Sequence, residues 1–257
     1  MKKLVLVVVL TAIISPLTFA QQDDDSIPPM PPRRSKAAKV GAFGGFTPGW
    51  LFVDVNPINE FLVPNLGAAL KDDGVVMFGG AGSAYIMFLP NVRVGGVGMS
   101  GSISSTSLEL FPSGQRLRRD AELTVGFGGV TIEYVVPIVE RLDVAFGTML
   151  GGGGIDITLR VSDGSDRLWT ELWGNFGGAS TGSNFTHKLS GSYFVWVPSV
   201  SLEYAALGWL GARLGASYVG MSAPSWELDN KAEILGVPGK VNGKGFMVNA
   251  GLFVGTF

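Results

Sequence analysis

Hydrophobic and polar residues alternate with a period of two over long stretches of this chain, from about residue 38 to the end. Such alternation is typical of β-strands whose two faces meet different surroundings. Clusters of Gly, Pro, Asn and Asp interrupt it at regular places, as expected for turns. The pattern predicts strands at residues 38–53, 74–88, 92–107, 119–136, 141–161, 191–205, 208–222 and 243–257.

The connections between these eight segments are alternately short and long. The short ones lie at 89–91, 137–140 and 206–207, and the long ones at 54–73, 108–118, 162–190 and 223–242. Outer-membrane barrels have short periplasmic turns and long extracellular loops. We therefore predict an all-β fold: an up-and-down antiparallel transmembrane β-barrel of eight strands, whose last strand pairs with its first. A hairpin hidden in the third or fourth long loop would raise the count to ten.

Twofold alternation also assigns side chains to the two faces of the predicted wall. The lumen face receives a set of charged residues close to the short turns: Arg93, Glu133, Arg141, Asp143, Glu203 and Arg213. The interior of an eight-stranded barrel is just wide enough for side chains to fill, and an unpaired buried charge is costly. We therefore predict a charge-paired plug. A narrow gated conduit is the alternative, favoured by the many glycines at lumen positions.

Aromatic residues recur beside the short turns. We predict that Tyr85, Tyr134, Tyr204 and the terminal Phe257 form an aromatic girdle on the outer surface, at the periplasmic boundary of the membrane. Tyrosines buried in the core of a soluble protein are the alternative. The stretch 56–70 has a short apolar periodicity, interrupted by Pro64, which favours a small helix on the barrel rim.

The N-terminus has the parts of a secretory signal: Lys2 and Lys3, an apolar run at 4–14 and a small-residue exit at Ala20. We predict a cleaved signal peptide at 1–20, since the run is shorter than the roughly 20 apolar residues of a membrane helix. Residues 21–37 hold a short acidic run at 23–25, a proline-rich stretch and then Arg33 and Arg34, which favours a flexible periplasmic linker ahead of a barrel at 38–257. The predicted location is the bacterial outer membrane.

The amino-acid composition limits which partners and reactions the chain is expected to have. A net charge of −2 with 16% charged residues gives no reason to expect a nucleic-acid partner, and the absence of cysteine excludes disulfides and thiolate chemistry. We expect no metal or cofactor. His187 is the only histidine, and Ser183, Ser190 and Ser192 lie near it in sequence. A lipid-modifying enzyme could pair His with Ser, but an exposed loop histidine is the simpler interpretation.

In architecture, the chain resembles the small outer-membrane barrels of the OmpA/OmpX type: a signal peptide, eight alternating segments, short turns opposite long loops, and a terminal Phe257 preceded by Phe253. The resemblance implies that the barrel-assembly machinery recognises the last strand. The expected partners are outer-membrane lipid and a ligand at the extracellular loops. The leading hypothesis is a non-enzymatic barrel with a structural or surface-interaction role. A narrow channel or small-ligand carrier comes second, and a lipid-modifying enzyme third.

Overall fold

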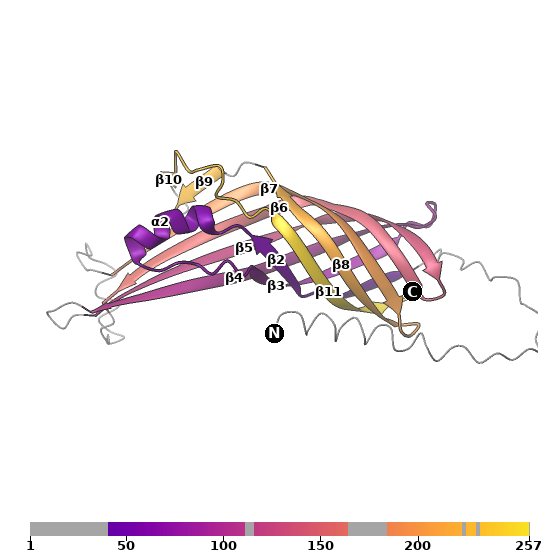
Figure 1. Ribbon diagram of the computed structural model, residues 1–257. Coiled ribbons are helices and arrows are strands. Elements are labelled where there is room, and N and C mark those ends of the chain that lie inside the picture. Colours follow the sequence, from indigo (N-terminus) through magenta and orange to yellow (C-terminus); the bar gives the residue numbers. More distant parts are fainter. Residues whose placement is uncertain (1–40, 111–115, 164–183, 223–224, 230–231, 257) are drawn as a thin grey trace, which may run out of the picture. The chain divides into compact units, whose positions relative to one another are not determined.

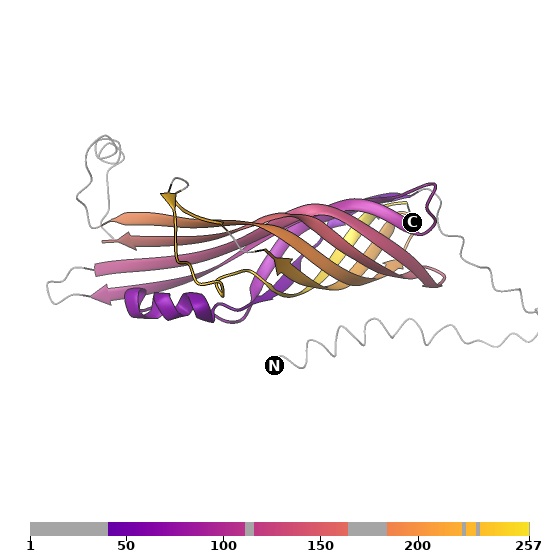
Figure 2. The same ribbon diagram turned by 90° about the horizontal axis from the view of Figure 1, so that it is seen from above.

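The computed structural model describes residues 41–110, 116–163, 184–222, 225–229 and 232–256 (Figures 1 and 2). The predicted signal peptide, the linker and Phe257 lie outside these residues. The described part contains one helix, α2 (Asn56–Leu66), and a single 11-stranded sheet. Its strands are β1 (Ala42–Phe46), β2 (Gly49–Val53), β3 (Val75–Tyr85), β4 (Val92–Leu110), β5 (Arg116–Val139), β6 (Leu142–Ser162), β7 (Phe185–Ala205), β8 (Leu210–Met221), β9 (Ser225–Leu228), β10 (Ala232–Glu233) and β11 (Gly245–Gly255).

Strands β1 and β2 are two halves of one barrel strand. Both pair with β3 on one side and β11 on the other. Pro48 lies between them and has no N–H to donate. The Thr47 N–H still donates to the Gly79 carbonyl (2.9 Å), and the Ala250 N–H donates to the Pro48 carbonyl (3.0 Å). Pairing therefore continues through the interruption without a change of register.

When β1 and β2 are counted as one strand, the sheet closes into a ring. From the β1/β2 strand the pairing runs through β3, β4, β5, β6, β7 and β8 to β11, which returns to β1/β2, and every pair is antiparallel. The predicted eight-strand, up-and-down barrel is confirmed. The fourth long loop does contain a hairpin, β9–β10, but β9 pairs with Leu189–Ser192 of β7 instead of entering the ring. The ring keeps eight strands, not ten.

The short and long connections lie at opposite ends of the barrel, as the alternation predicted. The three short turns join β3 to β4, β5 to β6 and β7 to β8. At the other end, strands β4 to β7 continue past the rest of the ring (Figures 1 and 2). We call these ends the turn end and the loop end.

Helix α2 and the fourth long loop cover the inner face of the extended strands. Leu123, Ile155 and Ile157 on this face belong to the same buried core as Leu62 of α2 and Val241 of the loop. A small helix was predicted here, and it is confirmed. It passes through Pro64 and ends before Gly67, whose left-handed conformation (φ 69°) closes the last turn. No helix in the described residues is long and apolar enough to cross a membrane.

Candidate functional site in the barrel lumen

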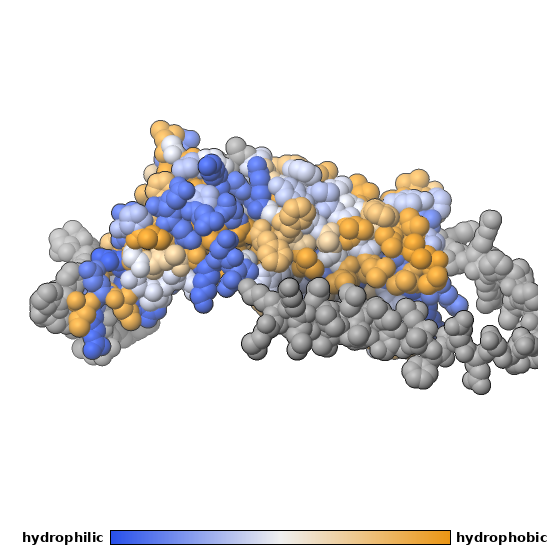
Figure 3. Space-filling model, viewed as in Figure 1, coloured by the Kyte–Doolittle hydropathy of each residue, from blue (hydrophilic) through white to orange (hydrophobic). Residues whose placement is uncertain are grey.

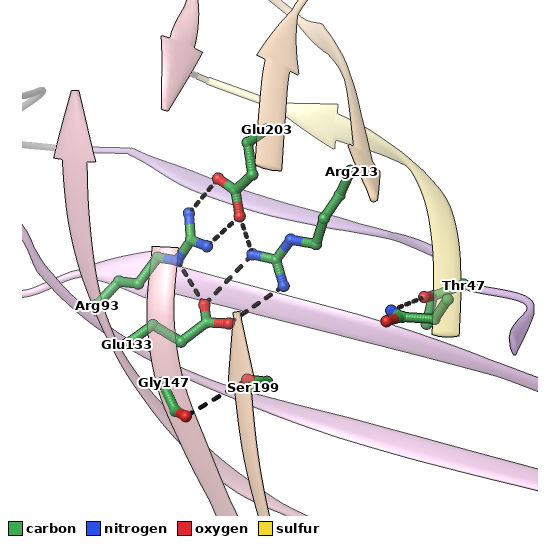
Figure 4. Close-up of polar contacts among 8 residues, drawn as sticks. Thr47, Arg93, Glu133, Gly147, Ser199, Glu203 and Arg213 are labelled. Atoms are coloured by element: carbon green, nitrogen blue, oxygen red, sulfur yellow. Dashed lines mark hydrogen bonds and ion pairs between the residues drawn. The ribbon is translucent and has the colours of Figure 1, made fainter. Parts of the chain in front are cut away.

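Four of the six charged residues predicted for the lumen meet at its turn end. The sheet register places Arg93 of β4 directly opposite Glu133 of β5, and Glu203 of β7 directly opposite Arg213 of β8. Side chains of directly opposed residues share one face of a sheet. Each pair therefore points into the barrel, and the two pairs approach each other across the lumen (Figure 4). We call these four residues the charge quartet.

The charge quartet is linked by a closed set of ion pairs (Figure 4). Arg93 Nε lies 2.6 Å from Glu133 Oε2, and Arg93 Nη1 lies 2.7 Å from Glu203 Oε2. Arg213 Nη1 lies 3.2 Å from Glu133 Oε1, and Arg213 also contacts Glu203. The Arg93 side chain is 0% exposed. Two guanidinium and two carboxylate groups give the quartet a formal charge of zero, which is the condition under which buried charges are tolerated.

Two phenylalanines cover the charge quartet. The Arg93 guanidinium carbon lies 4.9 Å from the Phe43 ring centre, and that of Arg213 lies 5.1 Å from the Phe253 ring centre. The two rings meet edge to face with centres 5.4 Å apart. Cations over aromatic faces at these distances are attracted by the ring quadrupole. This role was not predicted from the sequence: Phe253 has the same strand parity as Phe257, which was assigned to the outer surface, but Phe253 is buried in the lumen.

The other two predicted members of the cluster lie elsewhere. Arg141 is exposed in the β5–β6 turn and has a φ of 70°, so its assignment to the lumen was wrong. A turn residue belongs to neither strand, and strand parity does not apply to it. Asp143 is half-buried on the lumen face opposite Glu203, but it forms no ion pair among the described residues. The guanidinium groups of the quartet are already directed at Glu133 and Glu203.

One tyrosine of the predicted girdle was also assigned to the wrong face. Tyr85 lies directly opposite Arg93 and therefore points into the lumen, where it interacts electrostatically with Arg93. Tyr134 and Tyr204 are 50% and 49% exposed on the outer face, near the turns, and their place at the membrane boundary stays a prediction. Phe257 lies outside the described residues.

A chamber lined by both polar and apolar side chains lies next to the charge quartet, on its loop-end side. It has a volume of about 70 Å³, and its lining includes Glu133, Arg213, Ser83, Ser217 and Asn249. The hydroxyls of Ser83 and Ser217 and the Nε of Arg213 are buried and have no hydrogen-bond partner among the described residues. Buried groups of this kind are normally satisfied by ordered water, which needs two to four polar partners. The chamber is therefore suited to a small cluster of water molecules or a small polar solute.

Apolar side chains fill the lumen beyond the chamber, toward the loop end. Five methionines from five different strands contribute to this part of the core, each at most 5% exposed. They are Met77, Met99, Met149, Met221 and Met247. We call them the methionine layer. Methionine fills irregular gaps because its side chain is unbranched and flexible. The layer belongs to the same buried core as Leu62 of α2, and Met99, Met149 and Met247 also line the chamber.

The outer wall of the barrel has the opposite character. Large apolar side chains point outward from all eight positions of the ring, at 36% to 68% exposure. They include Phe46, Phe78, Val130, Ile132, Phe146, Leu150, Phe194, Trp196, Leu252 and Val254. We call this surface the apolar belt. On one face, hydrophobic residues gather over the turn-end half and hydrophilic residues over the extended strands (Figure 3).

His187 is not assembled with the serines considered for catalysis. Its Nδ1 lies 3.1 Å from Asp229 Oδ2, and both side chains are about half exposed. Ser190 and Ser192 lie an odd number of residues from His187 on β7, so they point to the opposite face of the sheet. Ser183 lies outside the described residues. No group of three or more His, Asp or Glu side chains suitable for a metal ion occurs in the described part of the chain.

No protein-family model and no curated protein matches the chain. Several solved structures do match the chain. The attachment invasion locus protein Ail of Yersinia pestis, in complex with the heparin analogue sucrose octasulfate, is 11% identical, with 83% of this chain and 97% of that chain covered and a TM-score of 0.34. A major outer membrane protein of Thermus thermophilus is 9% identical, with 84% of this chain and 98% of that chain covered and a TM-score of 0.42. The outer membrane protease OmpT of Escherichia coli is 10% identical, with 85% of this chain and 96% of that chain covered and a TM-score of 0.35.

Similarities this distant say nothing about activity. The architecture rests on the sheet itself: a closed ring of eight antiparallel positions, with short turns at one end and long connections at the other. The predicted resemblance to small outer-membrane barrels is confirmed at this level.

Proposed function

We propose that the protein is an integral outer-membrane β-barrel without enzymatic activity, with a closed lumen and a structural or surface-interaction role. The apolar belt carries this proposal. A soluble protein rarely exposes an apolar patch of more than a few hundred Å², and here such side chains encircle the ring. Lipid is the environment that suits such a surface. A closed ring is the only kind of sheet that leaves no unpaired backbone groups in the hydrocarbon of the membrane.

The height of the apolar belt supports the same proposal. On β5 the outward positions are apolar or glycine from Tyr134 up to Gly126, and they become polar at Thr124 and Glu122. With a rise of about 3.3 Å per residue and a strand tilt of about 40°, the distance from Tyr134 to Thr124 corresponds to roughly 25 Å along the barrel axis. Outer-membrane barrels have an apolar band of about this height.

The first test is the location of the protein. We expect it in the outer-membrane fraction of the producing cells, and we expect its unheated form to migrate differently from its boiled form on a denaturing gel, because a closed barrel resists detergent until heated. The same gel assay reports whether any variant has folded. Recovery in the soluble periplasmic fraction would contradict the proposal.

A narrow channel or small-ligand carrier is the second candidate, favoured by the chamber and its buried polar groups. It requires a path past both the charge quartet and the methionine layer. We expect no discrete openings in planar lipid bilayers, either for the natural chain or for Arg213→Ala, because the methionine layer would still close the lumen. Lys188→Ala, on the outer face of an extended strand, is the control. Discrete openings that change in Arg213→Ala but not in Lys188→Ala would establish the channel instead.

The surface-interaction role is assigned to the loop end. Strands β4 to β7 extend beyond the apolar belt, and their outward positions there carry charged and hydroxyl side chains, such as Asp120, Arg160 and Lys188. These side chains would stand on the extracellular side, where a polar ligand could reach them.

A further inference from the structure

The three short turns expose apolar side chains, although turns at a barrel end that faced water would be expected to be polar. Six of these residues are between 48% and 83% exposed: Met87, Phe88, Ile138, Val139, Leu207 and Trp209. We call them the turn collar. Phe88 is the most exposed of the six, at 83%. Because each of the three turns contributes two members, the surface belongs to the whole turn end and not to one irregular loop.

Charge is almost absent from the turn collar. Among residues 86–91, 138–141 and 206–209, the charged residues are Glu140 and Arg141, which are adjacent and opposite in sign. Exposed apolar patches rimmed by a few polar groups mark surfaces that contact a membrane or a partner. The turn collar meets this description, and its neutrality favours a partner that is itself apolar at the point of contact.

The turn collar is continuous with the apolar belt. Ile138 and Val139 follow Tyr134 on the same strand, and Leu207 follows Tyr204 within three residues. Since the belt from Tyr134 upward already has the height of a hydrocarbon core, the collar lies just beyond that core. The headgroup region of each leaflet adds roughly 5–8 Å to a bilayer. Two or three further residues of tilted strand and turn cover about this depth.

We propose that the turn collar is inserted in the headgroup and acyl-chain boundary of the periplasmic leaflet, so that the turn end is held within the membrane surface. The occupant of this surface is phospholipid, and the inference rests on the proposed membrane location of the apolar belt. Trp209 has the side chain that prefers this boundary, since its ring is apolar and its N–H can reach water. Arg141, exposed in the same region, can extend its guanidinium group to a lipid phosphate.

The chain has no cysteine, so single-cysteine variants can be labelled at one site with an environment-sensitive fluorophore. Phe88→Cys and Val139→Cys report on the turn collar, Val130→Cys on the apolar belt and Ser104→Cys on the extended strands. The folded full-length variants are placed in vesicles of phosphatidylethanolamine and phosphatidylglycerol. Lipids brominated either near the carboxyl end or near the methyl end of their acyl chains then serve as quenchers.

We expect the two collar labels to lose fluorescence, and to lose more with bromine near the carboxyl end than near the methyl end. The label at 130 should be quenched and the label at 104 should not. If the collar labels behave like the label at 104 while the label at 130 is quenched, the inference is overturned and the proposed function stands. If the label at 130 is also unquenched, the proposed function fails as well. Collar labels unquenched in vesicles but shielded in native outer membrane would assign the collar to a protein partner instead.

Discussion

Arg93→Ala is expected to lower the free energy of unfolding by about 3–5 kcal/mol, the usual cost of removing one partner from a buried ion pair. Arg93 is fully buried and contacts both Glu133 and Glu203. Without it, Arg213 alone faces two carboxylates, and the charge quartet acquires a net charge of −1 in a place that water reaches poorly. Urea unfolding in lipid vesicles, followed by tryptophan fluorescence, measures the change.

Arg118→Ala is the matched control for this prediction. Arg118 also forms an ion pair, with Asp120 at 2.9 Å, but its side chain is 54% exposed on the extended part of β5. Exposed pairs of this kind contribute about 0–1 kcal/mol. Equal effects of the two substitutions would contradict the view that the charge quartet is a buried, mutually dependent unit.

A compensated variant separates the loss of charge pairing from the loss of packing. Arg93→Met, Glu133→Leu, Glu203→Leu and Arg213→Met together remove every charge and keep comparable side-chain volumes. Replacing a whole buried ion network by apolar residues is often neutral or stabilising. We therefore expect this quadruple variant to be more stable than Arg93→Ala alone, despite having four changes instead of one. A quadruple variant less stable than Arg93→Ala would mean that packing dominates at this site.

Gly151→Ala is expected to destabilise the barrel by about 1–3 kcal/mol or more, the cost of overpacking a closely packed interior, whereas Gly152→Ala is expected to be tolerated. Gly151 faces the lumen on β6, and a Cβ added there would lie 2.0 Å from the carbonyl oxygen of Gly128 and 2.6 Å from the Cα of Gly129. Both obstacles are backbone of the neighbouring strand, so a side-chain rotation cannot relieve them. The two strands would have to move apart.

Gly152 is the next residue on the same strand and faces outward. The nearest atom to a Cβ there is 4.0 Å away, which is ordinary contact. Alanine at such a position also restricts the unfolded chain and can stabilise by about 0.4–1 kcal/mol. Heat-modifiable migration and urea unfolding of the two variants test the pair. If both are equally tolerated, the strands are not as closely packed at the lumen face as the structure places them.

Much of this architecture could be predicted from the sequence because a strand has a period of two and a turn has its own residues. Those rules are local, and they gave the eight strands, the opposite placement of short and long connections, and the inward direction of Arg93, Glu133, Glu203 and Arg213. The same rule would have corrected Tyr85. Tyr134 and Tyr204 lie nine residues before Asp143 and Arg213, but Tyr85 lies eight before Arg93. A spacing that is shorter by one residue turns the side chain to the opposite face of the sheet.

The tertiary structure alone decided which side chains meet. Arg93 and Glu203 are 110 residues apart in sequence and come together across the lumen because the ring closes with a particular stagger between its strands. That stagger also set the height at which Phe43 and Phe253 cover the quartet, and it left Asp143 outside the quartet. It also brought the methionine layer into the same core as α2. Periodicity assigns a residue to a face, but its level along the barrel axis depends on the pairing of every strand at once.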